Sequence, residues 1–184
     1  MHVDTNMINN CAEGVFPSPY PSLSWFVVYT KPLTEKKVAD RLCLLGIENY
    51  LPLYTTLRQW SDRKKKIERP LINSVVFVHC TAAELQQLYT VPSVAGVLRW
   101  DGKPAVVKAH EIQNLRILLQ QVGAAELEPI ALEPGTPIEV TRGPFKGIIG
   151  TAVQVLNSLR VLIELRQLGV AFSVNVPKSF VKTL

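Results

Sequence analysis

The chain has 184 residues, of which 47% are hydrophobic and 19% are charged, and its net charge is +5. This length allows one or two domains, and the apolar content suffices for real cores. It has no apolar run of about 18–20 residues and no basic start followed by an apolar stretch, so we expect no membrane span, no secretory signal and a cytoplasmic protein. The cysteines and histidines are scattered without CxxC spacing, which indicates reduced thiols and no metal site.

Positive charge is concentrated in two parts of the chain. Residues 58–69 carry six basic and two acidic residues, and residues 135–184 carry the same numbers. Each part therefore has a net charge of +4, and the remainder sums to −3. This placement favours contact with a polyanion over a general role in solubility.

The first elements follow a proline-bearing leader. Residues 1–24 have no periodicity, and we expect them to be disordered. The run WFVVYT at 25–30 predicts a central strand. A helix is predicted from Thr34, as its cap, to about Leu45, and Gly46 would end it. Val38, Leu42 and Leu45 share one face of that helix.

The middle of the chain alternates strands and helices. Two extended pieces are predicted around Pro52, and a buried strand over 72–80. The sequence from Thr81 to Glu84 is a capping box that predicts a short helix, ended by Pro92. A strand over 94–100, an Asp-Gly turn at 101–102 and a short run at 105–107 come next.

A last helix, over 109–122, completes the N-terminal part, with Ile112, Leu115 and Leu119 on one stripe. The order β-α-β-β-α-β plus a terminal helix predicts a ferredoxin-like α+β domain over 25–122, with helices on one face of an antiparallel sheet. Residues 123–134 contain two prolines and three glutamates and predict a linker.

Residues 135–184 predict a small β-barrel of about five short strands. Proline and glycine recur through EPGTPIEVTRGPFKGIIG at 133–150, which indicates sharply bent strands. The segment SLRVLIELRQL at 158–168 fits a strand pair or a helix equally well. The alternation of Val170, Phe172, Val174 and Val176 favours the barrel.

These strings resemble the NusG family of transcription elongation factors. The string at 133–150 resembles a KOW motif, whose residues here are Gly143, Pro144, Phe145, Gly147 and Gly150. The N-terminal part is similar to the NGN domain through WFVVYTKP, PLINSVVFV, VPSVAGVL and KPAVV. The string TLRQWSDRKKKIERPL and the leader are most similar to the specialised UpxY-type antiterminators of Bacteroidetes.

The resemblance implies that the NGN domain binds the clamp helices of the largest RNA polymerase subunit through an exposed apolar pocket. Aromatic and aliphatic anchors would be desolvated against a coiled coil there. It also implies that the start of the second helix meets the opposite jaw of the polymerase cleft. The matching positions are Tyr29, Ile72, Val75, Phe77, Val97 and Leu98 for the pocket, and Glu84, Gln86 and Gln87 for the helix.

The basic segment would lie near the upstream DNA fork. Its lysines and arginines can neutralise phosphates without reading sequence, and its tryptophan can stack on an unpaired non-template base. A solvated charged hairpin is the alternative interpretation. The residues in question are Arg58, Trp60, Arg63, Lys64, Lys65, Lys66 and Arg69.

The KOW barrel implies a further partner, a ribosomal protein or Rho, and Leu168 and Gly169 match the docking loop by position. The loop lacks the aromatic residue of the housekeeping factor. No catalytic motif or cofactor-binding motif is present, so we expect a monomeric, non-enzymatic factor without cofactors. The alternatives are a general NusG-type factor working with Rho and the ribosome, and a ribosome- or RNA-binding KOW protein.

Overall fold

The computed structural model describes residues 23–59, 64–81, 84–121, 129–130, 135–155 and 158–184. The chain divides into two compact units, one of residues 1–52 and 70–106, the other of residues 53–69 and 107–184. The leader predicted over 1–24 falls almost wholly outside the described residues. The motif-based domain boundaries at 24/25, 122/123 and 134/135 stay a prediction.

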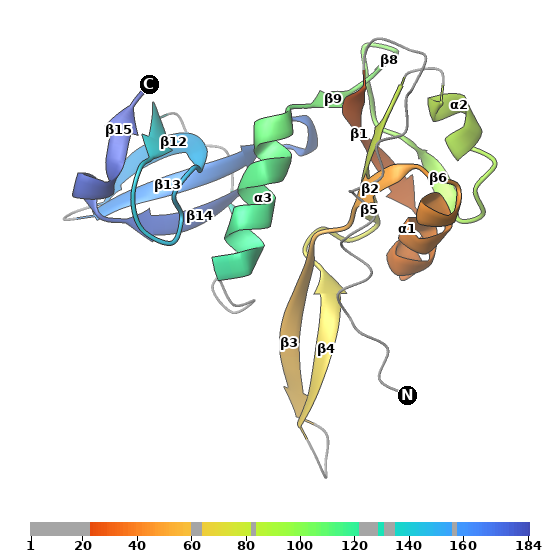
Figure 1. The fold of residues 1–184 in the computed structure, drawn as a ribbon, viewed down its shortest axis with the longest axis horizontal. Coiled ribbons are helices and arrows are strands. Elements are labelled where there is room, and N and C mark those ends of the chain that lie inside the picture. The colour runs from red at the N-terminus through yellow and green to blue at the C-terminus, as the bar shows by residue number, and fades with distance from the viewer. Residues whose placement is uncertain (1–22, 60–63, 82–83, 122–128, 131–134, 156–157) are drawn as a thin grey trace. The chain divides into compact units, whose positions relative to one another are not determined.

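The first unit is built on an antiparallel sheet with the strand order β2-β5-β1-β6 (Figure 1). Its central strands, β1 (Ser24–Thr30) and β5 (Val75–Cys80), are nearly continuous runs of buried apolar side chains. The outer strands are β2 (Glu48–Tyr50) and β6 (Val94–Val97), and β9 (Val106–Val107) also pairs with β1. The apolar runs are nearly continuous because side chains on both faces of these strands are buried, with Tyr29 of β1 as an exception.

Helix α1 (Glu35–Leu44) covers one face of this sheet. Asn49 of β2 donates a hydrogen bond to the Ala39 carbonyl of α1, and Asn49 pairs in register with Val78 of β5. The helix therefore lies on the face that carries Val78. The opposite face carries Tyr29, Val75 and Phe77, because side chains alternate along a strand.

The predicted ends of α1 need two corrections. Thr34 makes no side-chain cap, and its hydroxyl donates instead to the carbonyl of Lys31 at 2.7 Å. Leu45, predicted on the buried face, is exposed, whereas Val38 and Leu42 are buried. Gly46 does end the helix, with φ at 72°.

The capping box is confirmed. The Thr81 amide donates to the Glu84 carboxylate at 2.8 Å, and the Glu84 amide donates to the Thr81 hydroxyl at 3.3 Å. The helix that it opens, α2 (Leu85–Leu88), has only four residues. The predicted strand over 94–100 is broken at Leu98 into β6 and β7 (Arg99–Trp100), and β7 pairs with β8 (Lys103–Pro104). Asp101 and Gly102 both have positive φ, as a tight hairpin turn requires.

The second unit contains a two-stranded ribbon, a helix and a barrel. The ribbon is β3 (Leu53–Gln59) with β4 (Lys64–Pro70). The two extended pieces predicted around Pro52 are confirmed as β2, which ends before it, and β3, which begins after it. Helix α3 (Ala109–Gln121) buries Ile112, Leu115 and Leu118, whereas the predicted Leu119 is only half-buried. Its contacts in this unit are with barrel strands β12 and β13.

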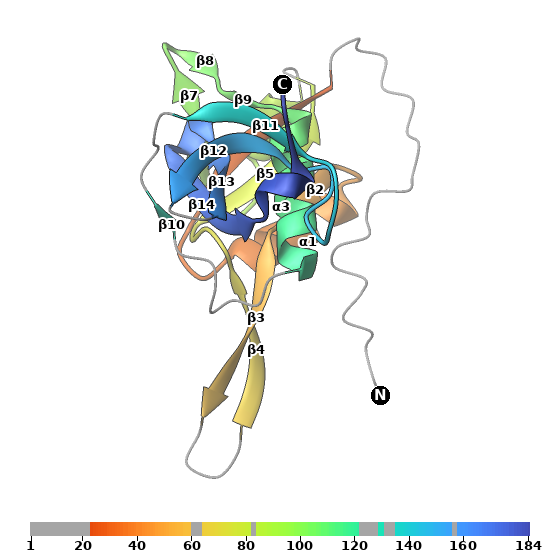
Figure 2. The same cartoon turned by 90° about the vertical axis from the view of Figure 1, so that its left-hand side faces the viewer.

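The barrel is a six-stranded sheet with the order β10-β14-β13-β12-β11-β15. Its long strands curve around a common interior (Figure 2). Ile163 of β13 and Phe172 of β14 are buried and pair in register, so they share one face of the sheet. The fold is therefore α+β, with an NGN-like sheet and helices followed by a β-rich barrel, as predicted. The strands are β10 (Pro129–Ile130), β11 (Thr136–Val140), β12 (Ile149–Val155), β13 (Ser158–Leu165), β14 (Val170–Val176) and β15 (Val181–Thr183).

The segment that fitted a strand or a helix is a strand. β13 pairs with β12 on one side and with β14 on the other, and only Arg166–Leu168 forms a 3-10 turn. Part of the predicted linker is also a strand, because β10 pairs with β14.

Candidate functional site

Tyr29 is the one predicted pocket residue on β1, and its side chain reaches the surface. It is 37% exposed in a strand whose other side chains, Ser24 aside, are buried. Its neighbours in register are Val75 on β5 and Gly96 on β6. A Cβ added at Gly96 would meet nothing within 4 Å, so the ring has open space beside it. Tyr29 is thus an accessible aromatic anchor on the face of the sheet opposite α1.

Ile72 lies in a turn that a buried carboxylate from α1 fixes. Ser74, two residues further on, has a φ of 58°, which is unfavourable for a residue with a side chain. Its amide donates to Glu35 Oε1 at 2.7 Å, and its carbonyl accepts from the Thr30 amide at 2.9 Å. These bonds tie the half-buried Ile72 to the end of the strand that carries Tyr29. The strand predicted over 72–80 therefore begins only at Val75.

The remaining pocket residues are mostly core. Val75, Phe77 and Val97 are buried, with Phe77 fully inaccessible and stacked near Tyr50 at a centroid distance of 6.4 Å. Leu98 is half-buried. These residues support the surface from beneath, so direct contact with a partner would fall to Tyr29 and Ile72.

The predicted residues of α2 divide by role. Glu84 is occupied by the capping box, since its Oε2 accepts from both the amide and the hydroxyl of Thr81 at 2.8 Å. Gln86 and Gln87 are exposed. Two exposed polar side chains on a short helix can hydrogen-bond a partner.

The described residues of the basic segment lie in the β3–β4 ribbon. Lys66 and Arg69 are exposed on β4. Arg58, Lys64 and Lys65 lie within the strands, but their side chains are outside the described part, and Trp60 and Arg63 lie outside the described residues altogether. Exposed lysine and arginine side chains can neutralise phosphates, so contact of this ribbon with nucleic acid stays a prediction.

The glycines of the KOW motif are required for different structural reasons. Gly143 and Gly147 have φ values of 81° and 92°, which side chains rarely adopt. Gly150 lies in β12 so close to β13 that an added Cβ would overlap the Leu162 carbonyl. Pro144 is exposed and Phe145 half-buried in the same turn. In the predicted docking loop, Leu168 is half-buried and Gly169 is left-handed, with φ at 66°.

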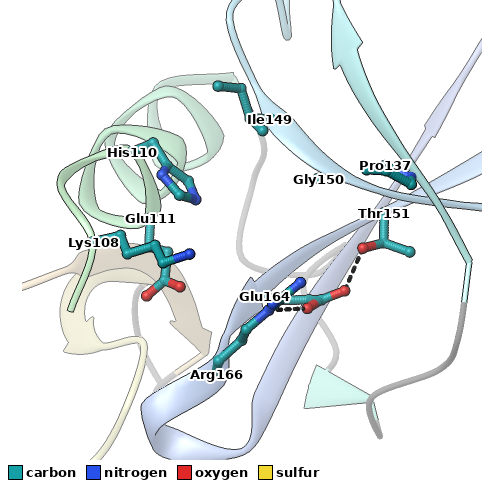
Figure 3. Close-up of a pocket in the computed structure, with 9 residues that line it drawn as sticks. All are labelled: Lys108, His110, Glu111, Pro137, Ile149, Gly150, Thr151, Glu164 and Arg166. Carbon is teal, nitrogen blue, oxygen red and sulfur yellow. Dashed lines mark hydrogen bonds and ion pairs between the residues drawn. The ribbon is translucent and has the colours of Figure 1, made fainter. Parts of the chain in front are cut away.

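Sequence reasoning missed a polar cluster where α3 meets the barrel (Figure 3). The Asn114 side chain makes two hydrogen bonds with Ile149 of β12, donating to its carbonyl at 2.5 Å and accepting from its amide at 3.1 Å. Glu164 accepts from Thr151 Oγ1 at 2.5 Å and from Arg166 Nε at 2.9 Å. No sequence motif marks these residues, because Asn114 lies 35 residues from Ile149 and Thr151 lies 13 residues from Glu164.

Neither a metal centre nor a reactive thiol emerges from the described part of the chain. Those residues bring together no group of three metal-binding side chains, and none of their helices has the length and apolar character needed to cross a bilayer. Cys80 is a free thiol, and burial, with a smaller contribution from the Glu84 carboxylate, raises its pKa to about 12. Cys43 is disulfide-bonded, which corrects the expectation of reduced thiols at that position.

Comparison with known proteins gives the family. The family described as "Transcription termination factor nusG" matches residues 23–116, which is more than half of the chain. The chain belongs to the NusG family. No curated protein sequence matches the chain.

Two solved structures are similar to this NusG-family chain. One, described as "Domain interaction in Thermotoga maritima NusG", has 21% sequence identity and a TM-score of 0.44, covering 89% of this chain and 98% of the other. The second, "Crystal Structure of MjSpt4:Spt5 complex conformation A", has 18% identity and a TM-score of 0.29, covering 87% and 97%. Family membership supports a role in transcription elongation, and proteins of this family bind RNA polymerase without being enzymes.

Proposed function

We propose that this NusG-family protein is a specialised antiterminator, which binds RNA polymerase through its first unit and suppresses pausing or termination in particular operons, such as those for surface polysaccharides. The observation that carries the polymerase contact is Tyr29, a 37% exposed aromatic residue beside the open space at Gly96. An aromatic anchor with accessible apolar area suits the clamp helices of the largest subunit. The cytoplasm is the location that this role requires.

The ribbon supports the specialised role. Lys66 and Arg69 are exposed on β4, and the six basic residues of 58–69 would neutralise phosphates of the non-template strand at the upstream fork. Contacts of this kind add affinity in a salt-dependent way. Gln86 and Gln87 on α2 supply polar contacts to the opposite jaw of the polymerase cleft.

The barrel is proposed to recruit a further partner through the loop at Leu168 and Gly169. That loop offers a half-buried leucine and no aromatic residue, which argues against Rho. A ribosomal protein is the partner that we propose.

The decisive experiment is retention of the full-length protein by core RNA polymerase. The double variant Tyr29→Ala with Ile72→Asp should lose retention, because it removes the anchor and buries a charge at the contact. The matched control is Tyr89→Ala, which removes another exposed tyrosine of the same unit, and it should be retained like the unmodified protein. Absence of retention for the unmodified chain, or full retention of the double variant, refutes the polymerase contact.

A purified transcription assay separates the specialised role from general NusG function. We expect read-through of pause and termination sites when the protein is added. Stimulation of Rho-dependent termination would instead assign the general role. A protein that acts only through an RNA-binding barrel would have neither effect. It would still bind RNA when the Tyr29 and Ile72 substitutions are present.

A further inference from the structure

Helix α3 and the barrel enclose a small cavity lined with charged side chains. Its volume is about 100 Å³. Figure 3 shows the side chains that line it. The helix contributes Glu111 and the exposed His110, with Lys108 just before it. The barrel side is formed by β11, β12, β13 and the 3-10 turn, through Pro137, Ile149, Gly150, Thr151, Glu164 and Arg166.

Glu111 is the unusual member of this group. Its side chain is 4% exposed, and its Oε2 has no hydrogen-bond partner. An ionised carboxylate that keeps one buried oxygen without a donor is costly, whereas a protonated carboxyl needs far less solvation. The packed arrangement therefore favours the protonated form of Glu111 over the ionised form.

The charged neighbours do not cancel this preference for the protonated form. Arg166 uses its Nε to pair with Glu164 at 2.9 Å, and Glu164 is itself a second negative charge facing Glu111. Burial is the largest effect on Glu111 and raises its pKa, as does Glu164, while the Lys108 backbone hydrogen bond and the charges of Lys108 and Arg166 oppose the rise. The result is a raised pKa for the packed Glu111.

The same helix carries the bonds that hold it to the barrel. One turn after Glu111, Asn114 is 2% exposed and bonds both the amide and the carbonyl of Ile149. Separation of α3 from the barrel would break these two bonds and let water reach Glu111. Protection of the Ile149 amide against hydrogen exchange is thus coupled to the ionisation of Glu111, because one turn of α3 carries both Glu111 and Asn114.

We propose that packing of α3 on the barrel is proton-linked through Glu111, so that the contact is tightest with the carboxyl protonated and loosens as it ionises. This inference is independent of the polymerase contact. Its sign follows from linkage: a carboxyl that separates from the barrel regains water and its ordinary pKa of 4.5, while the packed one holds its proton to higher pH. The packing equilibrium falls as pH rises from about 4.5 through the raised pKa, by up to about tenfold per pH unit, and is flat outside this window.

The test uses the full-length chain labelled for NMR. Two quantities are followed from pH 4 to 8: the side-chain carboxyl shift of Glu111 and the hydrogen-exchange protection factor of the Ile149 amide. We expect Glu111 to titrate above an exposed glutamate and the Ile149 protection factor to fall across the same pH range. The Val161 amide, in the β12–β13 ladder, reports that the barrel itself stays folded.

Two variants complete the design. Glu111→Gln has no proton to lose, so its Ile149 protection should be high and independent of pH. Glu139→Gln removes a carboxylate of β11 that does not line the cavity and should behave like the unmodified chain. His110 lines the same cavity, and partial loss of solvent there, followed by the charges of Lys108 and Arg166, lowers its pKa, so a residual pH dependence in Glu111→Gln would belong to His110.

Three results overturn the proposal. They are an Ile149 protection factor that does not change with pH, the same pH dependence in Glu111→Gln as in the unmodified chain, and titration of Glu111 at the position of an exposed glutamate. The last measurement needs no variant, so it decides the question even if Glu111→Gln does not fold.

Discussion

Replacement of Glu35 by alanine should loosen the turn that carries Ile72. The Glu35 side chain is buried at the start of α1, and its carboxylate accepts the Ser74 amide at 2.7 Å. Ser74 adopts a φ of 58° there, a conformation that persists only where its surroundings hold it. Without the carboxylate, a partly buried amide loses its acceptor and the strain at Ser74 has nothing to offset it.

The magnitude follows from three contributions. A hydrogen bond to a charged group contributes about 1.5–3 kcal/mol, and an acidic residue in the first turn of a helix adds about 0.3–1 kcal/mol. Strain released when the turn relaxes returns part of this energy. We expect a net loss of about 2–3 kcal/mol, which is a factor of roughly 30 to 160 in a local opening equilibrium.

The assay is native-state hydrogen exchange of the Thr30 amide, which donates to the Ser74 carbonyl at 2.9 Å. Exchange at one amide is preferable to whole-chain denaturation, because two compact units need not unfold in one transition. Asp40→Ala, on the exposed side of the same helix, is the matched control and should leave Thr30 unchanged. Ser74→Gly in the Glu35→Ala background should recover about 1 kcal/mol, since glycine accepts positive φ.

Refutation is straightforward. If Glu35→Ala changes Thr30 exchange no more than Asp40→Ala does, the carboxylate does not hold the turn. If Ser74→Gly recovers nothing, strain at Ser74 is not part of the energetics.

Three further predictions concern the two units separately. Gly150→Ala places a Cβ on the Leu162 carbonyl and should cost about 3 kcal/mol or more, seen as loss of the barrel amide signals by NMR; an intact β12–β13 ladder would contradict it. Native Cys80 should resist alkylation at pH 8, because burial keeps its pKa near 12, and should react only after denaturation, as measured by mass spectrometry. Thr81→Val removes half of the capping box and should cost about 1 kcal/mol, read as an approximately fivefold faster exchange of the Glu84 amide.

The sequence predicted the elements that depend on neighbouring residues. The apolar run at Val75–Cys80, the capping box at Thr81 and the positive-φ turn at Asp101 and Gly102 each contain their own cause within a few positions. The place of Tyr29 in a strand was also predictable, because the local run WFVVYT at 25–30 indicates that strand. Its exposure did not, because exposure depends on what the other strands place beside it.

What sequence reasoning could not supply are contacts between distant segments. Glu35 and Ser74 lie 39 residues apart, and their hydrogen bond holds a turn just before β5. The strand therefore begins at Val75 and not at Ile72, where it was predicted to begin. Asn114 and Ile149 lie 35 residues apart, and neither residue belongs to a recognisable motif. A periodic apolar stripe likewise does not show which of two neighbouring leucines is buried. Tertiary packing buries Leu118 more fully than Leu119.

The central place of β13 in the barrel bears on how fast this part of the protein could change its fold. Leu162, Ile163 and Leu165 are fully buried or nearly so, and the strand shares ladders with β12 and β14 at once. No part of it can turn helical while either neighbour stays paired. A helical form of residues 158–168 would therefore be reached only after both ladders of β13 break, and its rate would rise steeply with temperature, as unfolding rates do.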